Sequence, residues 1–167
     1  MGGLMVDPLR LSQIRECAKK IRQIIGVNQD GYIDIVRIYE YIFPKIGIDF
    51  EVLTKTEMGT KHGETLIGKN IIHIREDIYE GACNGNGRDR LTMAHELGHL
   101  LLHRLDNISL ARNENCKIPP YCNPEWQANA FAGELLAPHR FLKDKEIYDI
   151  TSEYGVSVSA AKMQKKR

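Results

Sequence analysis

The sequence contains no uninterrupted apolar run of about 18 residues, the length that a membrane-spanning helix requires. Its first residues also lack the apolar core of a secretory signal peptide. These two absences argue against a helical membrane protein. They predict a cytoplasmic protein that has no membrane partner.

The sequence has few cysteines, and none of them form a C-x-x-C pair. The four are Cys17, Cys83, Cys116 and Cys122. This spacing is typical of reduced thiols in an intracellular protein rather than of a disulfide framework. A bridge between Cys116 and Cys122 stays open as an alternative.

A strong net charge is also missing, because 23 basic residues are balanced by 22 acidic ones to give +1. Such a chain has no overall field that attracts nucleic acid or membrane, so any contact of that kind must be local. Repeats and low-complexity segments are absent as well. The length of 167 residues, with 43% hydrophobic and 27% charged residues, fits one globular domain or one domain with a small appendage.

Hydrophobic periodicity predicts a helical layer followed by a small sheet. Apolar residues recur at spacings of three and four in residues 7–25, and again from Asp34 to Pro44, which predicts two helices. From Ile46 to Arg75 the period falls to two, so we expect three strands in a mostly antiparallel sheet. Gly68-Lys69-Asn70 is the expected hairpin turn. Residues 77–89 contain several glycines and are predicted to be a loop.

The second half of the chain is predicted to be helical, with one long interruption. Residues 88–105, RDRLTMAHELGHLLLHRL, form an apolar helix, and residues 106–123 form a long surface loop rich in asparagine and proline. Pro124 begins a helix that Pro138 interrupts. Two shorter helical patterns follow, in residues 140–154 and 157–167.

The apolar helix contains an HExxH pattern, His95-Glu96-Leu97-Gly98-His99. On an α-helix, residues four apart share a face and lie about 6 Å apart along the axis. His95 and His99 can therefore bind one Zn²⁺, with Glu96 beside them to transfer protons. The alternative is two core histidines on an ordinary buried helix. We favour zinc because the flanking leucines can bury the helix and a buried histidine needs a partner.

Two histidines do not complete a catalytic zinc site, which needs three protein ligands and a water. The metzincin pattern would place its third histidine at Leu105, so that solution fails. His103 continues the four-residue spacing, but it lies about 12 Å along the axis from His95. We expect His103 to hydrogen-bond to a ligand or to lie at the surface.

A glutamate on a second helix is another known solution, and Glu125 opens the helix that follows the long loop. Asn129 lies one turn further on the same face, where it could orient a ligand through a hydrogen bond. Glu134 is about 180° around the helix from Glu125, so both cannot face the metal. Three alternatives remain, one in the loop and two in or near the sheet: Glu114, His62 and His73.

HELGHLLLH followed by EWQANAFAGELLAP resembles the ImmA/IrrE family of metallopeptidases, whose two helices read HExGHxxLH and ExxANxFAxxLLxP. The resemblance covers about residues 10–165, with both motifs in the family's order. It implies that His95 and His99 are metal ligands, that Glu96 is the catalytic residue and that Glu125 is the third ligand. Longer relatives carry a C-terminal sensor domain that this sequence does not include.

The same resemblance implies a zincin-like fold, an intracellular location and a zinc-dependent proteolytic role. In that family the substrate is typically a helix-turn-helix repressor of a mobile element or stress regulon, and its cleavage or inactivation relieves repression. We therefore expect a zinc-dependent endopeptidase whose partner is such a repressor. Two other classes stay open: a DNA-binding regulator with a structural zinc, and a non-proteolytic anti-repressor.

The end of the chain, DITSEYGVSVSAAKMQKKR, is similar to the turn and second helix of a helix-turn-helix. Four cations would then meet DNA phosphates: Lys162, Lys165, Lys166 and Arg167. The alternative is a helical hairpin packed on the peptidase core. We favour the hairpin because a net charge of +1 gives little general affinity for DNA.

We thus predict an α+β, zincin-like fold with two N-terminal helices, a small mostly antiparallel sheet, the HExxH helix, a second ligand-bearing helix and a C-terminal helical segment. Residues 1–145 form the peptidase domain, and residues 146–167 form the helix-turn-helix-like segment packed on it. An edge strand beside the HExxH helix could bind a peptide substrate by main-chain pairing. The candidates for the oxyanion-stabilising group are Tyr121, His139, Tyr148 and Tyr154.

Overall fold

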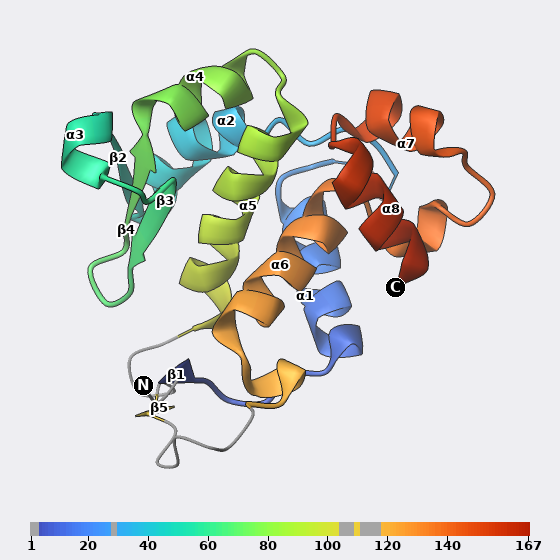
Figure 1. Cartoon of the computed structure of the whole chain (residues 1–167), viewed down its shortest axis with the longest axis horizontal. Coiled ribbons are helices and arrows are strands. Elements are labelled where there is room, and N and C mark those ends of the chain that lie inside the picture. Colours follow the sequence, from blue (N-terminus) through green and yellow to red (C-terminus); the bar gives the residue numbers. More distant parts are fainter. Residues whose placement is uncertain (1–3, 28–29, 104–108, 111–117) are drawn as a thin grey trace.

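The computed structural model describes residues 4–27, 30–103, 109–110 and 118–167 (Figure 1). The α+β class is confirmed, because the described residues form several helices and a small three-stranded sheet. The N-terminal layer contains helix α1 (Leu11–Ile24) and helix α2 (Ile35–Arg37). Helix α2 continues directly as the π-helix η1 (Ile38–Ile42) and the 3₁₀ helix η2 (Phe43–Ile46).

Helix α1 begins four residues later than its hydrophobic pattern predicts. The backbone N–H groups of Val6 and Leu9 donate to the carbonyls of Cys122 and Tyr121, at 3.0 and 2.9 Å. These bonds hold residues 6–9 against the segment before helix α6, and the helix begins after them.

The sheet contains β2 (Asp49–Leu53), β3 (Gly63–Leu66) and β4 (Ile71–Arg75) in the order β2-β4-β3. The predicted hairpin joins β3 and β4, with Gly68 and Asn70 at φ angles of 92° and 55°. Strands β2 and β4 are parallel, however, so the sheet is mixed rather than mostly antiparallel. The chain makes a crossover through the short helix α3 (Lys55–Met58) and β3 before β4 pairs with β2. A separate pair of short strands, β1 (Leu4–Met5) and β5 (Ser109–Leu110), was not predicted.

The prediction of a loop at residues 77–89 is wrong, because most of these residues form helix α4 (Glu76–Cys83). The reason lies in Gly81, which looks like a turn residue in the sequence. A Cβ at this position would lie 1.9 Å from Oδ2 of Asp89, so glycine is needed there for close packing inside a helix. Asn86 ends the short connection and caps the next helix through its side-chain oxygen.

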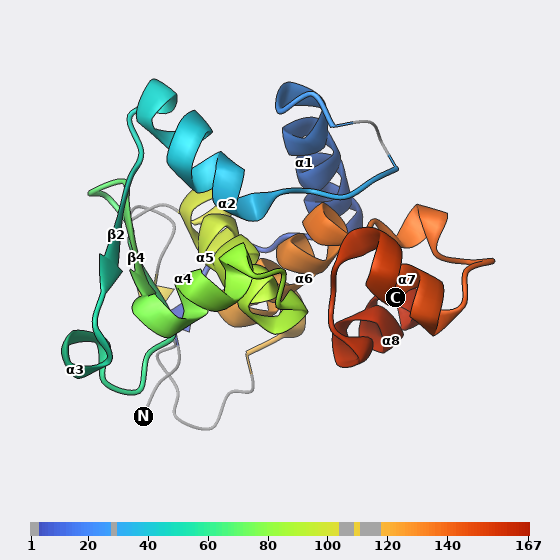
Figure 2. The same ribbon diagram turned by 90° about the horizontal axis from the view of Figure 1, so that it is seen from above.

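The HExxH helix is α5 (Gly87–Leu102), and α6 (Pro124–Leu136) crosses it. At the crossing, a Cβ on Gly98 would lie 3.2 Å from the backbone of Ala128, so small residues allow this close approach. In both views α5 lies between the sheet and α4 on one side and α1 and α6 on the other (Figures 1 and 2). The buried apolar core joins these layers, and its members include Ile14, Ile35, Ile72, Met93, Phe131 and Leu135.

The C-terminal helices α7 (Ile147–Tyr154) and α8 (Val158–Lys166) lie at the end of the molecule furthest from the sheet (Figure 2). Between them Gly155 adopts a left-handed conformation with φ of 60°. The buried guanidinium of Arg90, on α5, donates to the carbonyl of Tyr154 at 2.8 Å. Gln164 on α8 donates to Glu134 on α6 at 2.7 Å. The C-terminal helices therefore contact both helices of the HExxH crossing.

The HExxH helix ends at Leu102, three residues before the predicted end at Leu105, and the next residue, His103, has an extended backbone with φ of −115° and ψ of 135°. Most of the predicted long loop at 106–123 lies outside the described residues. Among the described helices, none is both long enough and apolar enough to cross a membrane.

Candidate metal centre

Helix α5 presents His95 and His99 on one face, as the four-residue spacing predicts. The Nε2 atoms of the two rings lie 2.9 Å apart. Helix α6 brings Glu125 to the same place, with its carboxylate oxygens 3.2 Å from His95 Nε2 and 3.3 Å from His99 Nε2. The three residues form a group whose possible ligand atoms all lie within 4.8 Å of one another.

These distances fit one tetrahedral zinc ion. Zinc binds histidine nitrogen and carboxylate oxygen at about 2.0–2.2 Å, so two such ligands on a tetrahedron lie about 3.3–3.5 Å apart. The observed separations from Glu125 to the two imidazoles are 3.2 and 3.3 Å, close to this range. The two Nε2 atoms, at 2.9 Å, lie about 0.4–0.6 Å closer than a tetrahedral ion requires, so the imidazoles must move slightly apart when the ion binds. The side chain of Glu125 is 66% exposed, so the group lies at the surface, where water or substrate can reach it. An open position is what distinguishes a catalytic zinc site from a structural one.

The hydrogen bonding of His95 favours the tautomer whose Nε2 is free to bind a metal. Its Nδ1 lies 3.1 Å from the side-chain amide oxygen Oδ1 of Asn129, so in the neutral ring Nδ1–H is the donor and Nε2 carries the lone pair. Asn129 thus contacts a histidine as the sequence predicts, with its oxygen placed to hold the ring.

The tautomer of His99 is set by a longer chain of hydrogen bonds that begins at two backbone carbonyls. The amide nitrogen of Gln127 donates to the carbonyls of Asp7 and Tyr121, at 2.8 and 2.7 Å, which turns its oxygen towards His103. His103 Nε2 lies 3.1 Å from that oxygen, and His103 Nδ1 lies 3.0 Å from His99 Nδ1. A neutral His103 must then donate through Nε2 and accept at Nδ1, so His99 donates through Nδ1.

When they are neutral, both histidines consequently direct an Nε2 lone pair into the same small space. Two lone pairs 2.9 Å apart repel each other unless a proton or a metal ion lies between them. Together with the carboxylate of Glu125, this donor set suits Zn²⁺. The residues present therefore fit the metal that the sequence predicts.

The ionisation of the group agrees with a cation site. Burial opposes protonation of His95, but the hydrogen bond to Glu125 and the charge of Glu96 outweigh burial and raise its pKa. Hydrogen bonds from His95 and His99 hold the pKa of Glu125 far below its usual range, so this carboxylate is charged. Burial and the neighbouring His99 lower the pKa of His103 to about 4, which keeps His103 neutral. The negative charge that favours protonated imidazole would also stabilise a bound metal ion.

Glu96 lies on the same helix but points to the edge strand β3. Its carboxylate Oε2 accepts a hydrogen bond from Thr65 Oγ1 at 2.7 Å, and the residue is only 7% exposed. A Cβ on Gly63 would lie 2.7 Å from Glu96 Cγ, so the glycine makes room for this side chain. Glu96, His95 and Gly63 line an open cleft of about 380 Å³. Glu96 is thus fixed beside the ligand group and faces the cleft.

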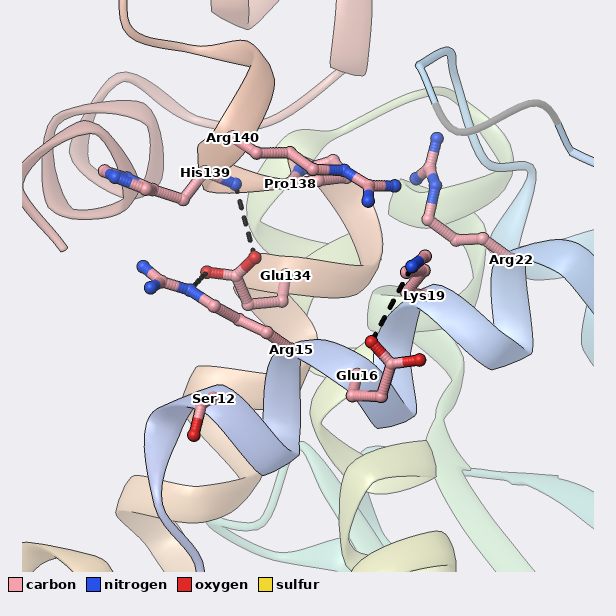
Figure 3. A pocket seen from close by; sticks show the side chains of 9 residues that line it. All are labelled: Ser12, Arg15, Glu16, Lys19, Arg22, Glu134, Pro138, His139 and Arg140. Carbon is pink, nitrogen blue, oxygen red and sulfur yellow. Dashed lines mark hydrogen bonds and ion pairs between the residues drawn. The ribbon is translucent and has the colours of Figure 1, made fainter.

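Other sequence candidates are placed elsewhere. His62 lines the cleft but is not part of the ligand group, and His73 lies on β4 with its ring 3.4 Å from Glu51. On the other side of α6, Glu134 accepts a hydrogen bond from Arg15 (Figure 3). It also accepts one from Gln164. Glu114 lies outside the described residues. None of the oxyanion candidates is among the residues that line the cleft: Tyr121, His139, Tyr148 and Tyr154.

Three contributors to the site were missed in the sequence: Gln127, Thr65 and Gly63. Gln127 is fully buried on a helix, and a buried glutamine flanked by apolar residues is a weak signal that it has a specific polar partner. Thr65 and Gly63 lie 31 and 33 positions before Glu96, and no local pattern connects them to it.

We expect Gln127→Leu to weaken zinc binding by about 10–100-fold, the usual cost of losing a group that orients a metal ligand. Without the amide, His103 is no longer held and His99 can adopt the wrong tautomer. The measurement is competition for zinc against a chelator of known affinity. Gln164→Leu is the matched control, because Gln164 is also buried and hydrogen-bonded but contacts Glu134. Equal zinc affinity in the two variants would contradict this role of Gln127.

Comparison with known proteins places the chain in a family. A search among curated proteins gave no match. Among solved structures, a Mycobacterium tuberculosis transcriptional regulator is similar, with a TM-score of 0.56 and 13% sequence identity. The alignment covers 90% of this chain and 46% of that one, so this chain spans less than half of the regulator's length. At this identity the likeness shows a shared fold alone.

The family comparison is more specific than the structural one. The model of Peptidase_M78, the IrrE N-terminal-like domain, matches residues 47–164. This range contains the β2-β4-β3 sheet, the HExxH helix, the Glu125 helix and nearly all of α8. The match extends over more than half of the chain and includes every residue of the candidate metal centre, and the chain therefore belongs to the Peptidase_M78 family.

Proposed function

We propose that the protein is a zinc-dependent endopeptidase that cleaves a helix-turn-helix repressor and so relieves repression of a mobile element or stress regulon. The observation that carries this proposal is the group formed by His95, His99 and Glu125, which offers three ligand atoms at a position near the surface. Membership of a peptidase family supports it. A cytoplasmic location is part of the proposal, since a repressor is found there.

The residues of the site divide the chemistry between them. Bound zinc would act as a Lewis acid, which lowers the pKa of water towards about 7 and polarises the scissile carbonyl. Glu96 would take the proton from the attacking water and pass it to the leaving amine. The hydroxyl of Thr65 lies 2.7 Å from the Glu96 carboxylate and 2.9 Å from the Glu96 backbone carbonyl, and when it donates to the carboxylate it holds the base beside the cleft. Asn129 and His103 would orient the two imidazoles.

The edge strand β3 offers a way to hold an extended peptide. One side of β3 pairs with β4, and β3 has no strand on its other side among the described residues. Gly63 of this strand lines the cleft together with Glu96 and His95. A substrate that adds to β3 by main-chain hydrogen bonds would place its peptide bonds beside the metal centre.

The direct test is to incubate the purified protein and zinc with the repressor encoded beside it. We expect two repressor fragments that appear with time and disappear when a chelator is present. Repressor that loses DNA binding without new fragments would instead favour the non-proteolytic anti-repressor. Zinc held by four protein ligands, with no exchangeable water, would favour a structural role and the DNA-binding regulator.

In this proposal the C-terminal segment 146–167 is a helical hairpin that packs on the peptidase domain 1–145 rather than a DNA-binding element. The hydrogen bonds from Arg90 to Tyr154 and from Gln164 to Glu134 support that assignment. Lys162 and Lys166 are exposed on α8 and could instead contact the repressor.

We expect Gly63→Ala to slow cleavage by up to about 100-fold while zinc content stays unchanged. The added methyl group would lie 2.7 Å from Glu96 Cγ and 2.9 Å from its Oε1, so the carboxylate must move. A displacement of about 1 Å in a reacting group can cost this much. Rates are measured by following the repressor fragments, and zinc by elemental analysis.

Substitutions of Thr65 provide the matched pair for the same contact. Thr65→Ser keeps the hydroxyl that donates to Glu96 and should cleave at close to the wild-type rate. Thr65→Val keeps the shape but loses the donor, and should be slower. If Gly63→Ala and Thr65→Val both retain full activity, the placement of Glu96 by β3 has no role in catalysis.

A further inference from the structure

A second cavity, of about 230 Å³, lies between α1 and the segment that follows α6 (Figure 3). Its lining includes Arg15, Lys19 and Arg22 from α1 and Glu134 and Arg140 from the other side. Glu134 comes nine residues after Glu125, which corresponds to two and a half turns of α6, so it lies on the opposite face and about 14 Å along the axis. The cavity is therefore separate from the metal centre and is not used in the proposed peptidase mechanism.

The lining of this cavity has more positive than negative charge. It contains four cationic side chains, those of Arg15, Lys19, Arg22 and Arg140, and two carboxylates. Both carboxylates already have partners within the protein, which are described next. The lining as a whole thus carries an excess of two positive charges, apart from any charge on His139.

The carboxylate of Glu134 is occupied on both oxygens. Its Oε1 accepts from Arg15 Nε at 3.0 Å and from Gln164 at 2.7 Å, and its Oε2 accepts from the backbone N–H of His139 at 3.3 Å. Glu16 lies 3.7 Å from Lys19. Neither acid offers a carboxylate to Arg140, whose guanidinium lies over the Phe141 ring, 4.6 Å from its centroid.

The cavity also has a donor that lacks an acceptor. The Nη2 atom of Arg15 is buried and has no hydrogen-bond partner among the described residues. A buried donor without a partner is unfavourable, and native proteins leave few of them. In Figure 3 this guanidinium lies on the other side of Glu134 from the ends of Arg22, Arg140 and Lys19, so Arg15 adds positive charge to the lining but is not placed to bind the same anion as those three.

The basic groups are arranged to meet one anion. In Figure 3 the nitrogen ends of Arg22, Arg140 and Lys19 face a common region. Arg22 is held in position by the carbonyls of Leu135 and Gly31, to which it donates at 2.5 and 2.6 Å. A guanidinium fixed in this way presents its charge without further loss of side-chain freedom.

We propose that this cavity binds a phosphate group, either as inorganic phosphate or as the phosphate of a small phosphoester. Guanidinium groups match phosphate oxygens through paired, charge-assisted hydrogen bonds, and lysine adds a point charge. The anion would compensate the excess positive charge contributed by α1 and by residue 140. It would link α1 to the C-terminal end of α6, the helix that carries Glu125 at its other end.

The test is a titration of the full chain with inorganic phosphate, followed by NMR of backbone and arginine side-chain N–H groups. Ionic strength is kept constant with chloride. The titration is repeated after metal removal, so that phosphate bound to a metal ion at the metal centre cannot cause the shifts. We expect saturable shifts in α1 and residues 138–140. In Arg140→Gln and Lys19→Gln the affinity should fall by about tenfold or more, as for a hydrogen bond to a charged group.

Lys20→Gln is the matched control, because Lys20 is an exposed cation on the same helix outside the cavity. It should bind phosphate as the wild type does. A parallel titration with ADP separates the two sources of the phosphate: tighter binding than inorganic phosphate, again dependent on Arg140, identifies a phosphoester. Shifts that chloride reproduces, or an equal loss of affinity in Lys20→Gln, would overturn the proposal.

Discussion

Glu125→Ala should lose zinc almost completely. The site would keep only His95 and His99 as ligands, on a single helix, and α6 would no longer contribute to the metal. Structural zinc sites with four ligands gain about 10–16 kcal/mol, so one ligand corresponds to roughly 100- to 1,000-fold in affinity. The carboxylate also supplies the one negative charge among the ligands, which leaves the complete site with a net charge of +1 instead of +2.

Asn129→Ala gives the comparison that identifies the ligand. Asn129 lies on the same face of α6, one turn from Glu125, but contacts the metal centre only through His95 Nδ1 at 3.1 Å. Its loss should cost about 10–100-fold and leave partial zinc content. Glu80→Ala, at an exposed position on α4, is the control for removing a helical carboxylate. Zinc is counted per protein after dialysis against a competing chelator.

One outcome would show that the third ligand comes from another part of the chain than α6. If Glu125→Ala keeps a full equivalent of zinc while His73→Ala or Glu114→Ala loses it, the assignment to α6 is wrong. The structure makes this hard to arrange for His73, whose ring pairs with Glu51 and Glu64 on the sheet. Glu114 lies outside the described residues, so only the measurement can test it.

The part of the site that depends on helical periodicity could be predicted from the sequence. His95 and His99 are four residues apart, and Glu125 and Asn129 are also four apart on the second helix, so spacing alone places each pair on one face. The crossing of the two helices depends on Gly98 and Ala128, whose small size is visible in the sequence. The spacing within each helix is a local feature, whereas the crossing of the two helices was expected from the known solution that places a glutamate on a second helix.

The remaining features depend on contacts between distant segments. Gln127 acts through carbonyls of Asp7 and Tyr121, and Thr65 reaches Glu96 from a strand, so neither role has a local pattern. The parallel pairing of β2 with β4 has the same cause, because alternation of apolar residues shows a strand but not its neighbour. Helix α4 was missed for a different reason. Glycine in a sequence usually indicates a turn, but Gly81 is needed inside this helix because Asp89 packs closely against it.

Glu96→Gln should keep its zinc and lose at least about 100-fold in cleavage rate, because general acid–base catalysis typically contributes 10²–10⁴-fold. The substitution preserves shape, and the amide oxygen can still accept the hydrogen bond from Thr65 Oγ1. What it removes is the group that takes the proton from water and returns it to the leaving amine. Zinc content should not change, since the metal group consists of His95, His99 and Glu125.

Glu64→Gln is the matched control for Glu96→Gln. Glu64 lies on the neighbouring strand β3 and pairs with Lys61 rather than with the metal group. It should cleave the repressor at close to the wild-type rate with full zinc content. The two variants thus differ in one respect, the position of the carboxylate relative to the metal centre. Full activity in Glu96→Gln would remove Glu96 from the mechanism, whereas full zinc with no cleavage in that variant alone identifies it as the proton-transferring group.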